Sequence, residues 1–445
     1  MNPLMRSAVA VLAAVGLFGI ASCIDVEGAT REVCRENPGI CDVGDAGTPD
    51  GGGGQPDASD AGDAGDAGDA GDAGDAGDAG DAGDAGEVPD ANEMPGVDDG
   101  GHTAPSWEQT AEMAEPRFLH TATNVGNNRV LVVGGFKTWG IATASTQLYN
   151  TETDTWSNAG TLPIARAGHT ATLLKDGKVL IAGGENQFGP VAGALLYNPD
   201  TGGWTAAGTL NDARANHAAV LLSASGEVLV MGGGANTEDA LSTAELYDPD
   251  SKGWVRTSGP LSRTRNGLAA VELSGGGVLA VGGFDTGMLN AEIYQRGAGS
   301  WTPVPSTMAV PRVGHTATLL DSGEVLVVGT DKSLGPSFPG TSTELFVPGN
   351  WTWRDAGTLT EPRGSHTATR LLTKEVLVTG GTPDQDSSLR TVLLYRPSEG
   401  WREGPDMMEE RSLHRATLLD SGEVLVTGGV TTSGAALRTT EKYVP

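Results

Sequence analysis

The chain has 445 residues, with 57 acidic side chains against 28 basic ones and a formal net charge of −29. This balance excludes a basic nucleic-acid binder, because such proteins grip the phosphate backbone mainly through Lys and Arg. We therefore expect no nucleic-acid partner. Aromatic residues make up only 5% of the chain, so any core must use few of them.

The N-terminus has the features of an export signal. One basic side chain precedes an apolar run over residues 8–20, which is too short to span ~30 Å of hydrocarbon as a helix and fits a signal peptide over residues 1–22. The run ends in Ile20-Ala21-Ser22-Cys23, which resembles the lipobox of bacterial lipoproteins. The resemblance implies a lipidated Cys23 and a membrane partner. The alternative is an ordinary signal in which this cysteine is incidental.

The other two cysteines lie in the short segment 23–41. Cys34 and Cys41 are seven residues apart, and no cysteine follows them. In an exported protein a local disulfide between them is the expected state. A metal site is the weaker alternative, because no His lies nearby.

Residues 42–106 predict a disordered acidic linker. They contain no Lys or Arg, and nine consecutive Asp-Ala-Gly triplets occupy residues 60–86. Such a stretch cannot bury enough apolar surface to offset chain entropy. A self-repelling spacer is the favoured interpretation, and calcium binding by the aspartates is the alternative.

The remaining residues, 107–445, are one unit repeated seven times. An Arg-x-x-His motif recurs every 47 to 51 residues, with Leu268 at the His position of the fourth copy. In each copy the motif opens a short strand, and a second, β-branched strand ends in a Gly pair. A third strand ends in Tyr, or in Phe346 in the fifth copy, and Trp follows six or seven residues later. Four strands with turn residues between them predict one propeller blade.

The Gly pair, Tyr and Trp in this order resemble the kelch repeat, and the resemblance covers the whole of 107–445. It departs from the pattern at Leu268, at Thr330 in place of the second Gly, and at Phe346. The fold expected is all-β: a seven-bladed kelch-type propeller, preceded by the linker. The seventh copy stops at residue 445 without its fourth strand, while Trp107 stands alone before the first copy. We therefore expect the strand of Trp107 to close the ring.

The repeated side chains have both structural and functional interpretations. Trp and Tyr are expected as wedges between blades. The histidines should bond backbone in the adjoining blade, or else form a ring of imidazoles that titrates or binds metal. The arginines could form a mouth for an acidic ligand, or pair with Glu245, Glu292, Glu344 and Glu441. These arginines are Arg117, Arg166, Arg214, Arg265, Arg312, Arg363 and Arg411.

The loop between the second and third strands varies in length between copies, and variable loops on a rigid scaffold often carry recognition. It contains aromatic residues that no repeat position explains, and these either bind a ligand or pack on the rim. They are Phe136, Trp139, Phe188, Phe284 and Phe338.

The function expected is that of an exported, membrane-anchored binding module for a glycan or a protein, at the outer membrane or cell surface. The alternatives are a mutarotase-like enzyme acting on a carbohydrate or other small molecule, and a structural envelope role. Copper radical oxidases share the kelch propeller but need a Cys joined to Tyr, and no Cys follows residue 41. No catalytic residue, metal site or cofactor is predicted, and the sequence does not indicate an oligomeric state.

Overall fold

The computed structural model describes residues 104–235, 239–284, 289–330, 340–384 and 386–445. The expected signal peptide, Cys23, the Cys34–Cys41 disulfide and almost all of the linker lie outside these residues. Within them there is no helix that is long and apolar enough to cross a membrane.

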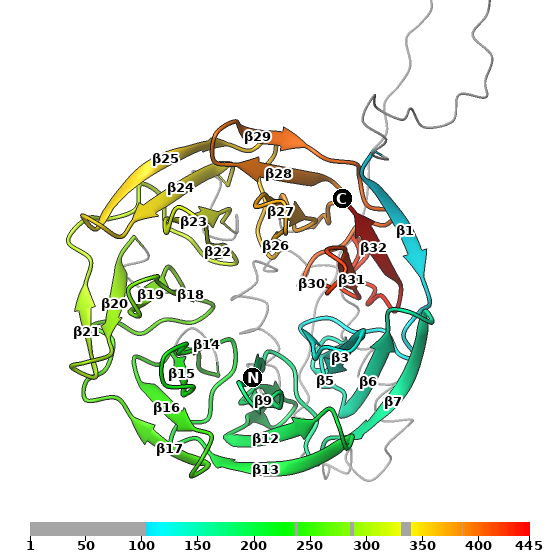
Figure 1. Ribbon diagram of the computed structural model, residues 1–445, viewed down its shortest axis with the longest axis horizontal. Helices are drawn as coiled ribbons and strands as arrows, with labels where there is room; N and C mark the ends of the chain where they lie inside the picture. The colour runs from blue at the N-terminus through cyan, green and yellow to red at the C-terminus, as the bar shows by residue number, and fades with distance from the viewer. Residues whose placement is uncertain (1–103, 236–238, 285–288, 331–339, 385) are drawn as a thin grey trace, which may run out of the picture. The chain divides into compact units, whose positions relative to one another are not determined.

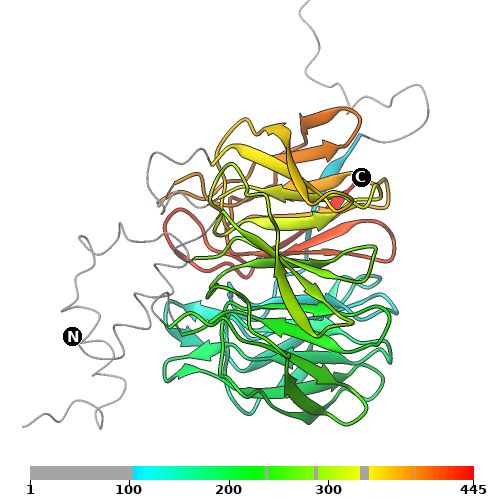
Figure 2. The same cartoon turned by 90° about the vertical axis from the view of Figure 1, so that its left-hand side faces the viewer.

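The described residues form seven antiparallel sheets of four strands each, arranged as blades around an axis (Figure 1). This confirms the expected fold. In the side view of Figure 2 the strands run across the thickness of the ring.

In each of the first four blades the strands follow one another in chain order from the axis outward. From the innermost to the outermost, they are β2 (Thr121–Asn124), β3 (Arg129–Val133), β6 (Ser145–Asn150) and β7 (Thr155–Thr161); β8 (Thr170–Leu173), β9 (Val179–Ala182), β12 (Gly193–Asn198) and β13 (Gly203–Thr209); β14 (Ala218–Leu221), β15 (Val228–Met231), β16 (Ala244–Asp248) and β17 (Gly253–Arg256); and β18 (Ala269–Glu272), β19 (Val278–Val281), β20 (Ala291–Gln295) and β21 (Ser300–Pro303).

Blades five to seven follow in the same order, and the last one takes its outer strand from the start of the propeller. Their strands are β22 (Thr316–Leu319), β23 (Val325–Val328), β24 (Ser342–Val347) and β25 (Thr352–Thr358); β26 (Thr367–Arg370), β27 (Val376–Thr379), β28 (Val392–Arg396) and β29 (Gly400–Glu403); and β30 (Arg415–Leu418), β31 (Val424–Thr427), β32 (Thr440–Val444) and β1 (Ser106–Thr110).

The ring closes as the sequence predicts. Strand β1 pairs with β32 and places Trp107 opposite Tyr443, with ring centroids 5.4 Å apart. The Trp107 indole N–H donates to the carbonyl of Pro405 in the preceding blade, 2.8 Å away. Closure therefore joins the two ends of the propeller by the β1–β32 strand pair (Figure 1). The contact between Trp107 and Tyr443 adds to it.

The core lies between neighbouring blades. The second strand of every blade is buried along its length; in β3 this is Arg-Val-Leu-Val-Val, in which all four valine and leucine side chains are buried. These strands are apolar on both faces because each face packs against a blade or against a loop. Cluster members such as Leu180 of blade two and Tyr247 of blade three meet in one core, so the tyrosines fill the seams between blades as expected.

Both residues of the Gly pairs adopt positive φ angles, for example 57° at Gly134 and 99° at Gly135. A Cβ on Gly134 would lie 2.4 Å from the Arg166 carbonyl oxygen of the next blade. The pair is therefore required both for its backbone conformation and for the close approach of the next blade.

The residue before each His position lies at the axis in a left-handed conformation, with φ between 51° and 68°. Successive members are joined by backbone hydrogen bonds of 2.7–3.1 Å around the axis, and six of the seven possible links are present among the described residues. We call these seven residues the axial ring: Leu119, Gly168, Asn216, Gly267, Gly314, Ser365 and Leu413.

Replacing Ser365 by Gly should stabilise the propeller. Its φ of 53° costs a residue with a Cβ about 1–2 kcal/mol. Glycine avoids this cost, but its larger conformational entropy in the unfolded state offsets part of the stabilisation. We expect the free energy of unfolding to rise by about 0.5–1 kcal/mol in urea denaturation. Ser398→Gly, at an exposed turn residue without a positive φ, should give no gain. Equal effects of the two changes would contradict the interpretation.

Candidate functional site

The seven repeated arginines lie inside the blades. Each is at most 1% exposed, and each donates from Nη1 to the carbonyl of the first Gly of its own blade; for Arg117 and Gly134 the distance is 2.8 Å. A second carbonyl, at the start of the third strand, accepts from the same nitrogen, as Ser145 does for Arg117 at 3.3 Å. The guanidinium groups thus hold the loop between strands two and three and do not line a mouth open to a ligand.

Most of these arginines have a carboxylate partner. The four glutamates expected from the sequence are in place, at 3.0 Å for Arg214–Glu245 and 2.7 Å for Arg411–Glu441, with Arg265–Glu292 and Arg312–Glu344 between them. Arg363 pairs with Glu361 instead, at 3.0 Å.

Two arginines have no ion pair within the described residues. Arg117 donates to the Ser145 hydroxyl, which itself donates to Glu115, while Arg166 bonds only carbonyl oxygens. Burial lowers the pKa of both arginines to about 10. Because both remain buried and hydrogen-bonded, the lack of a carboxylate does not open either one to a ligand.

The histidines also belong to the fold. In five of six cases the ring nitrogen Nε2 bonds a threonine hydroxyl of the adjoining blade, such as Thr121 for His169 at 3.0 Å. His315 instead bonds a backbone carbonyl of the adjoining blade, that of Val281, which is the bond that the sequence predicts. Burial and the neighbouring arginine lower the pKa of His217 to about 3, and the other five shift the same way. The described residues contain no group of three or more His, Cys, Asp or Glu side chains placed to hold a metal ion.

The loop aromatics differ sharply in exposure. Phe136 is 2% exposed and packs with Phe118 and Trp139, whereas the Phe188 side chain is 86% exposed. Phe284 is half-buried, and Phe338 lies outside the described residues. Of the four aromatic candidates that the structure describes, Phe188 is thus the one most open to a ligand.

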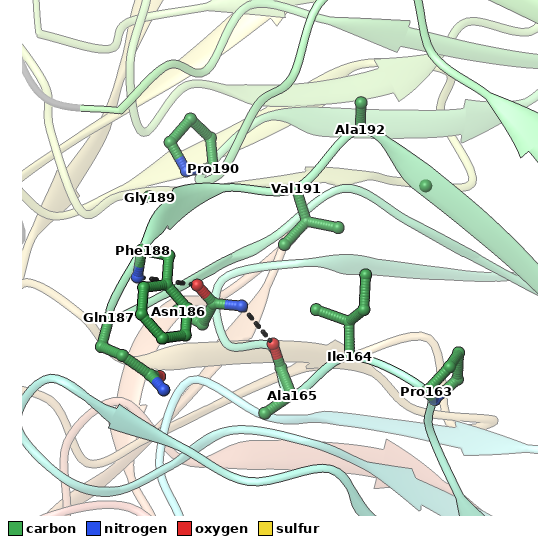
Figure 3. Close-up of a pocket in the computed structure, with 11 residues that line it drawn as sticks. Pro163, Ile164, Ala165, Asn186, Gln187, Phe188, Gly189, Pro190, Val191 and Ala192 are labelled. Atoms are coloured by element: carbon green, nitrogen blue, oxygen red, sulfur yellow. Dashed lines mark hydrogen bonds between the residues drawn. The ribbon is translucent and has the colours of Figure 1, made fainter.

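Phe188 stands at the tip of a small hairpin formed by β10 (Glu185–Asn186) and β11 (Gly189–Pro190). The Asn186 side chain braces this hairpin, because it accepts from the Phe188 N–H at 2.8 Å and donates to the Ala165 carbonyl at 3.2 Å (Figure 3). The bracing fixes the backbone of an exposed aromatic residue.

A groove of about 600 Å³ lies between this hairpin and the loop that leads into strand β8 (Figure 3). We call it the Phe188 groove. None of its lining residues is charged: Pro163, Ile164, Ala165, Asn186, Gln187, Phe188, Gly189, Pro190, Val191, Ala192 and Gly193.

Glu185, beside this groove in the chain, is a buried carboxyl. It is 2% exposed, and its Oε1 atom has no hydrogen-bond partner. Burial raises its pKa to about 8, against the opposing effect of a hydrogen bond with the Asn216 side chain. Glu185 forms an isolated β-bridge with Ala167. The equivalent bridges in blades one and seven join Phe136 to Phe118 and Val430 to Ser412, so Glu185 takes the inward position that an apolar residue takes in those two blades.

Glu185→Gln should change how stability depends on pH. The folded-state pKa of about 8 exceeds the usual unfolded value of about 4.3, so this carboxyl lowers stability as pH rises between the two, by at most about 1.4 kcal/mol per pH unit. The amide cannot ionise. We therefore expect the free energy of unfolding of the variant, measured by urea denaturation, to rise relative to that of the wild type between about pH 5.5 and about pH 8. Glu152→Gln, at an exposed residue, should show no such trend, and a parallel pH profile for Glu185→Gln would refute the assignment.

Comparison with known proteins agrees with the fold. Residues 97–283 match the family model described as the KLHDC2/KLHL20/DRC7 Kelch-repeats domain. A fungal alcohol oxidase of the AA5 family, solved in complex with copper, superposes with a TM-score of 0.66 at 18% identity and covers 77% of each chain. The structure of YjhT gives a TM-score of 0.51 at 16% identity, over 66% of this chain and 99% of that one. No curated protein sequence matches this chain.

At these identities the two solved structures indicate the fold and not a shared chemistry. The seven four-stranded blades make residues 106–445 a β-propeller, and the family match over residues 97–283 together with the repeat pattern supports its kelch type.

Proposed function

We propose that the propeller is a binding module whose ligand, a neutral glycan, docks in the Phe188 groove. The observation that carries this proposal is the 86% exposure of the Phe188 side chain at the edge of a groove of about 600 Å³. An aromatic side chain held this far out of the core has no role in packing, and exposed apolar surface beside a concavity commonly marks a binding site.

The lining of the groove supports a neutral, partly apolar ligand. Its surface combines Phe188, Ile164 and two prolines with the side-chain amide of Gln187, and it has no charged group. The flat ring can pack against the C–H face of a sugar while the amide bonds a hydroxyl group. An uncharged protein segment is the other occupant that such a lining admits.

The enzyme alternative has weaker support. A general acid acting on a carbohydrate must reach the substrate, and Glu185, the carboxyl with the raised pKa, is 2% exposed and does not line the groove. The repeated Arg and His side chains are likewise engaged within the fold. We therefore favour binding over catalysis.

Phe188→Ala should remove binding with little effect on stability. On glycan and peptide arrays, and in titrations with any glycan that binds, we expect affinity to fall at least about tenfold, as for an aromatic anchor in a binding site. Leu372→Ala is the matched control, because Leu372 is 66% exposed in a loop between first and second strands, on the opposite face. A glycan bound equally by both variants, or ligands found only among peptides, would contradict the proposal.

We also propose that Cys23 carries a lipid that holds the protein at a membrane, on the outer membrane or the cell surface. The sequence Ile20-Ala21-Ser22-Cys23 supports this, and two or more acyl chains give stable anchoring where one does not.

In detergent phase partitioning of the full chain, Cys23→Ser should move the protein from the detergent phase to the aqueous phase. Cys41→Ser removes a different cysteine of the same segment and should leave partitioning unchanged. Detergent partitioning of Cys23→Ser equal to that of the wild type would argue against the lipid.

A further inference from the structure

A second hollow, of about 300 Å³, lies at the axis on the face where the axial ring is found. All seven residues of the axial ring line it, together with four histidines, Thr170, Thr316, Leu268 and Arg415. The lining contains no Asp or Glu. Arg415 is therefore the one lining residue that carries a charge at neutral pH, since burial keeps the histidines neutral.

Arg415 departs from the repeat. It follows the His of the seventh blade, at the first residue of an innermost strand, and the other six blades have only Thr or Ala at this position. Those residues are Thr121, Thr170, Ala218, Ala269, Thr316 and Thr367. In four blades this residue is a Thr whose hydroxyl bonds the histidine of the next blade. A long cation has thus replaced a small neutral residue at the start of an innermost strand.

The guanidinium group of Arg415 has little to bind within the described residues. It makes one hydrogen bond, from Nη1 to the His414 carbonyl at 3.1 Å, and no carboxylate lies within ion-pair distance of it. Its Nε and Nη2 atoms have no partner, yet neither is among the fully buried unpaired atoms. Both donors therefore keep some exposed surface, and Arg415 lines the hollow. Burial alone shifts its pKa, downward.

Beside Arg415 the axial ring has branched residues at positions whose backbone conformation favours glycine. Leu413 and Leu119 are neighbours in the axial ring, with φ of 54° and 51°, although a branched side chain is costly in this conformation. Glycine occupies the same place in three other blades. Strain and an unpaired charge thus occur together on one side of the hollow, and such local departures from a repeat often accompany function.

We propose that the axial hollow binds a small oxyanion, a phosphate, sulfate or carboxylate group, on Arg415. The Nε and Nη2 atoms form the fork that matches two oxygens of such a group. Ser365, whose hydroxyl has no partner among the described residues, lines the same hollow and can donate a further hydrogen bond. This inference does not depend on the Phe188 groove.

The test is thermal unfolding of the full chain in sodium chloride, phosphate, sulfate and acetate at equal ionic strength. Phosphate and sulfate stabilise most proteins without a specific site, so the comparison is with Arg415→Thr, which restores the residue of four other blades. We expect an oxyanion to raise the unfolding temperature of the wild type by several degrees more than that of the variant. In chloride alone the variant should be the more stable, because it removes an uncompensated charge.

Three further arms sharpen the result. Arg415→Lys keeps the charge without the fork and should bind the same anion about tenfold more weakly by calorimetry, which covers the case that the Thr variant folds poorly. Arg390→Thr, at an exposed arginine paired with Asp406, should respond like the wild type, as should Phe188→Ala. A carboxylate response without a phosphate response would identify an organic acid, and the reverse an inorganic oxyanion. Equal shifts in wild type and Arg415→Thr for every anion would overturn the proposal.

Discussion

The ring depends on one hydrogen bond that is repeated at every seam. The second residue of each Gly pair donates its N–H to the carbonyl of the next blade's repeated arginine, as Gly135 does to Arg166 at 2.9 Å. The same arginine donates from its side chain to the first Gly of its own blade. Each arginine therefore connects two blades, and its burial is what this geometry requires. A Cβ on the first Gly of each pair would lie 2.2–2.6 Å from that carbonyl oxygen, so the first residue must be Gly, whereas the second can be Thr330, which donates to Arg363 in the same way.

The periodic part of the sequence predicted the fold well because every periodic residue serves these seams. The number of blades, the closure by Trp107 and the four Glu partners all follow from columns of the repeat. The structure does not show the suggested ring of arginines open to a ligand, because the direction of an arginine side chain depends on the backbone turn before it. That turn, in which the second residue after each arginine has a positive φ, is not evident from side-chain type when Leu119 and Leu413 adopt it.

The loops between second and third strands were harder to predict for a related reason. Phe136 and Phe188 are both aromatic residues of the same loop in adjacent blades, but one is buried and the other is exposed. Phe136 comes directly after the Gly pair and faces inward against Phe118, whereas Phe188 comes four residues after its pair, at the hairpin tip. Composition alone does not separate them. Position relative to the Gly pair does, and it also explains why Glu185 is buried.

Glu185 and Arg415 are two ionisable groups at repeat positions that hold uncharged residues in most of the other copies. Paired with each other, they could offset part of the cost of their burial. Each instead has a pKa shifted mainly by burial, and neither appears among the charges that shift the other. Glu185 avoids the cost of a buried charge by holding a proton, so it is neutral inside the blade. An arginine stays charged at any physiological pH, so Arg415 stays a cation that is open to the axial hollow, and an anion from solution is the partner that the fold leaves room for.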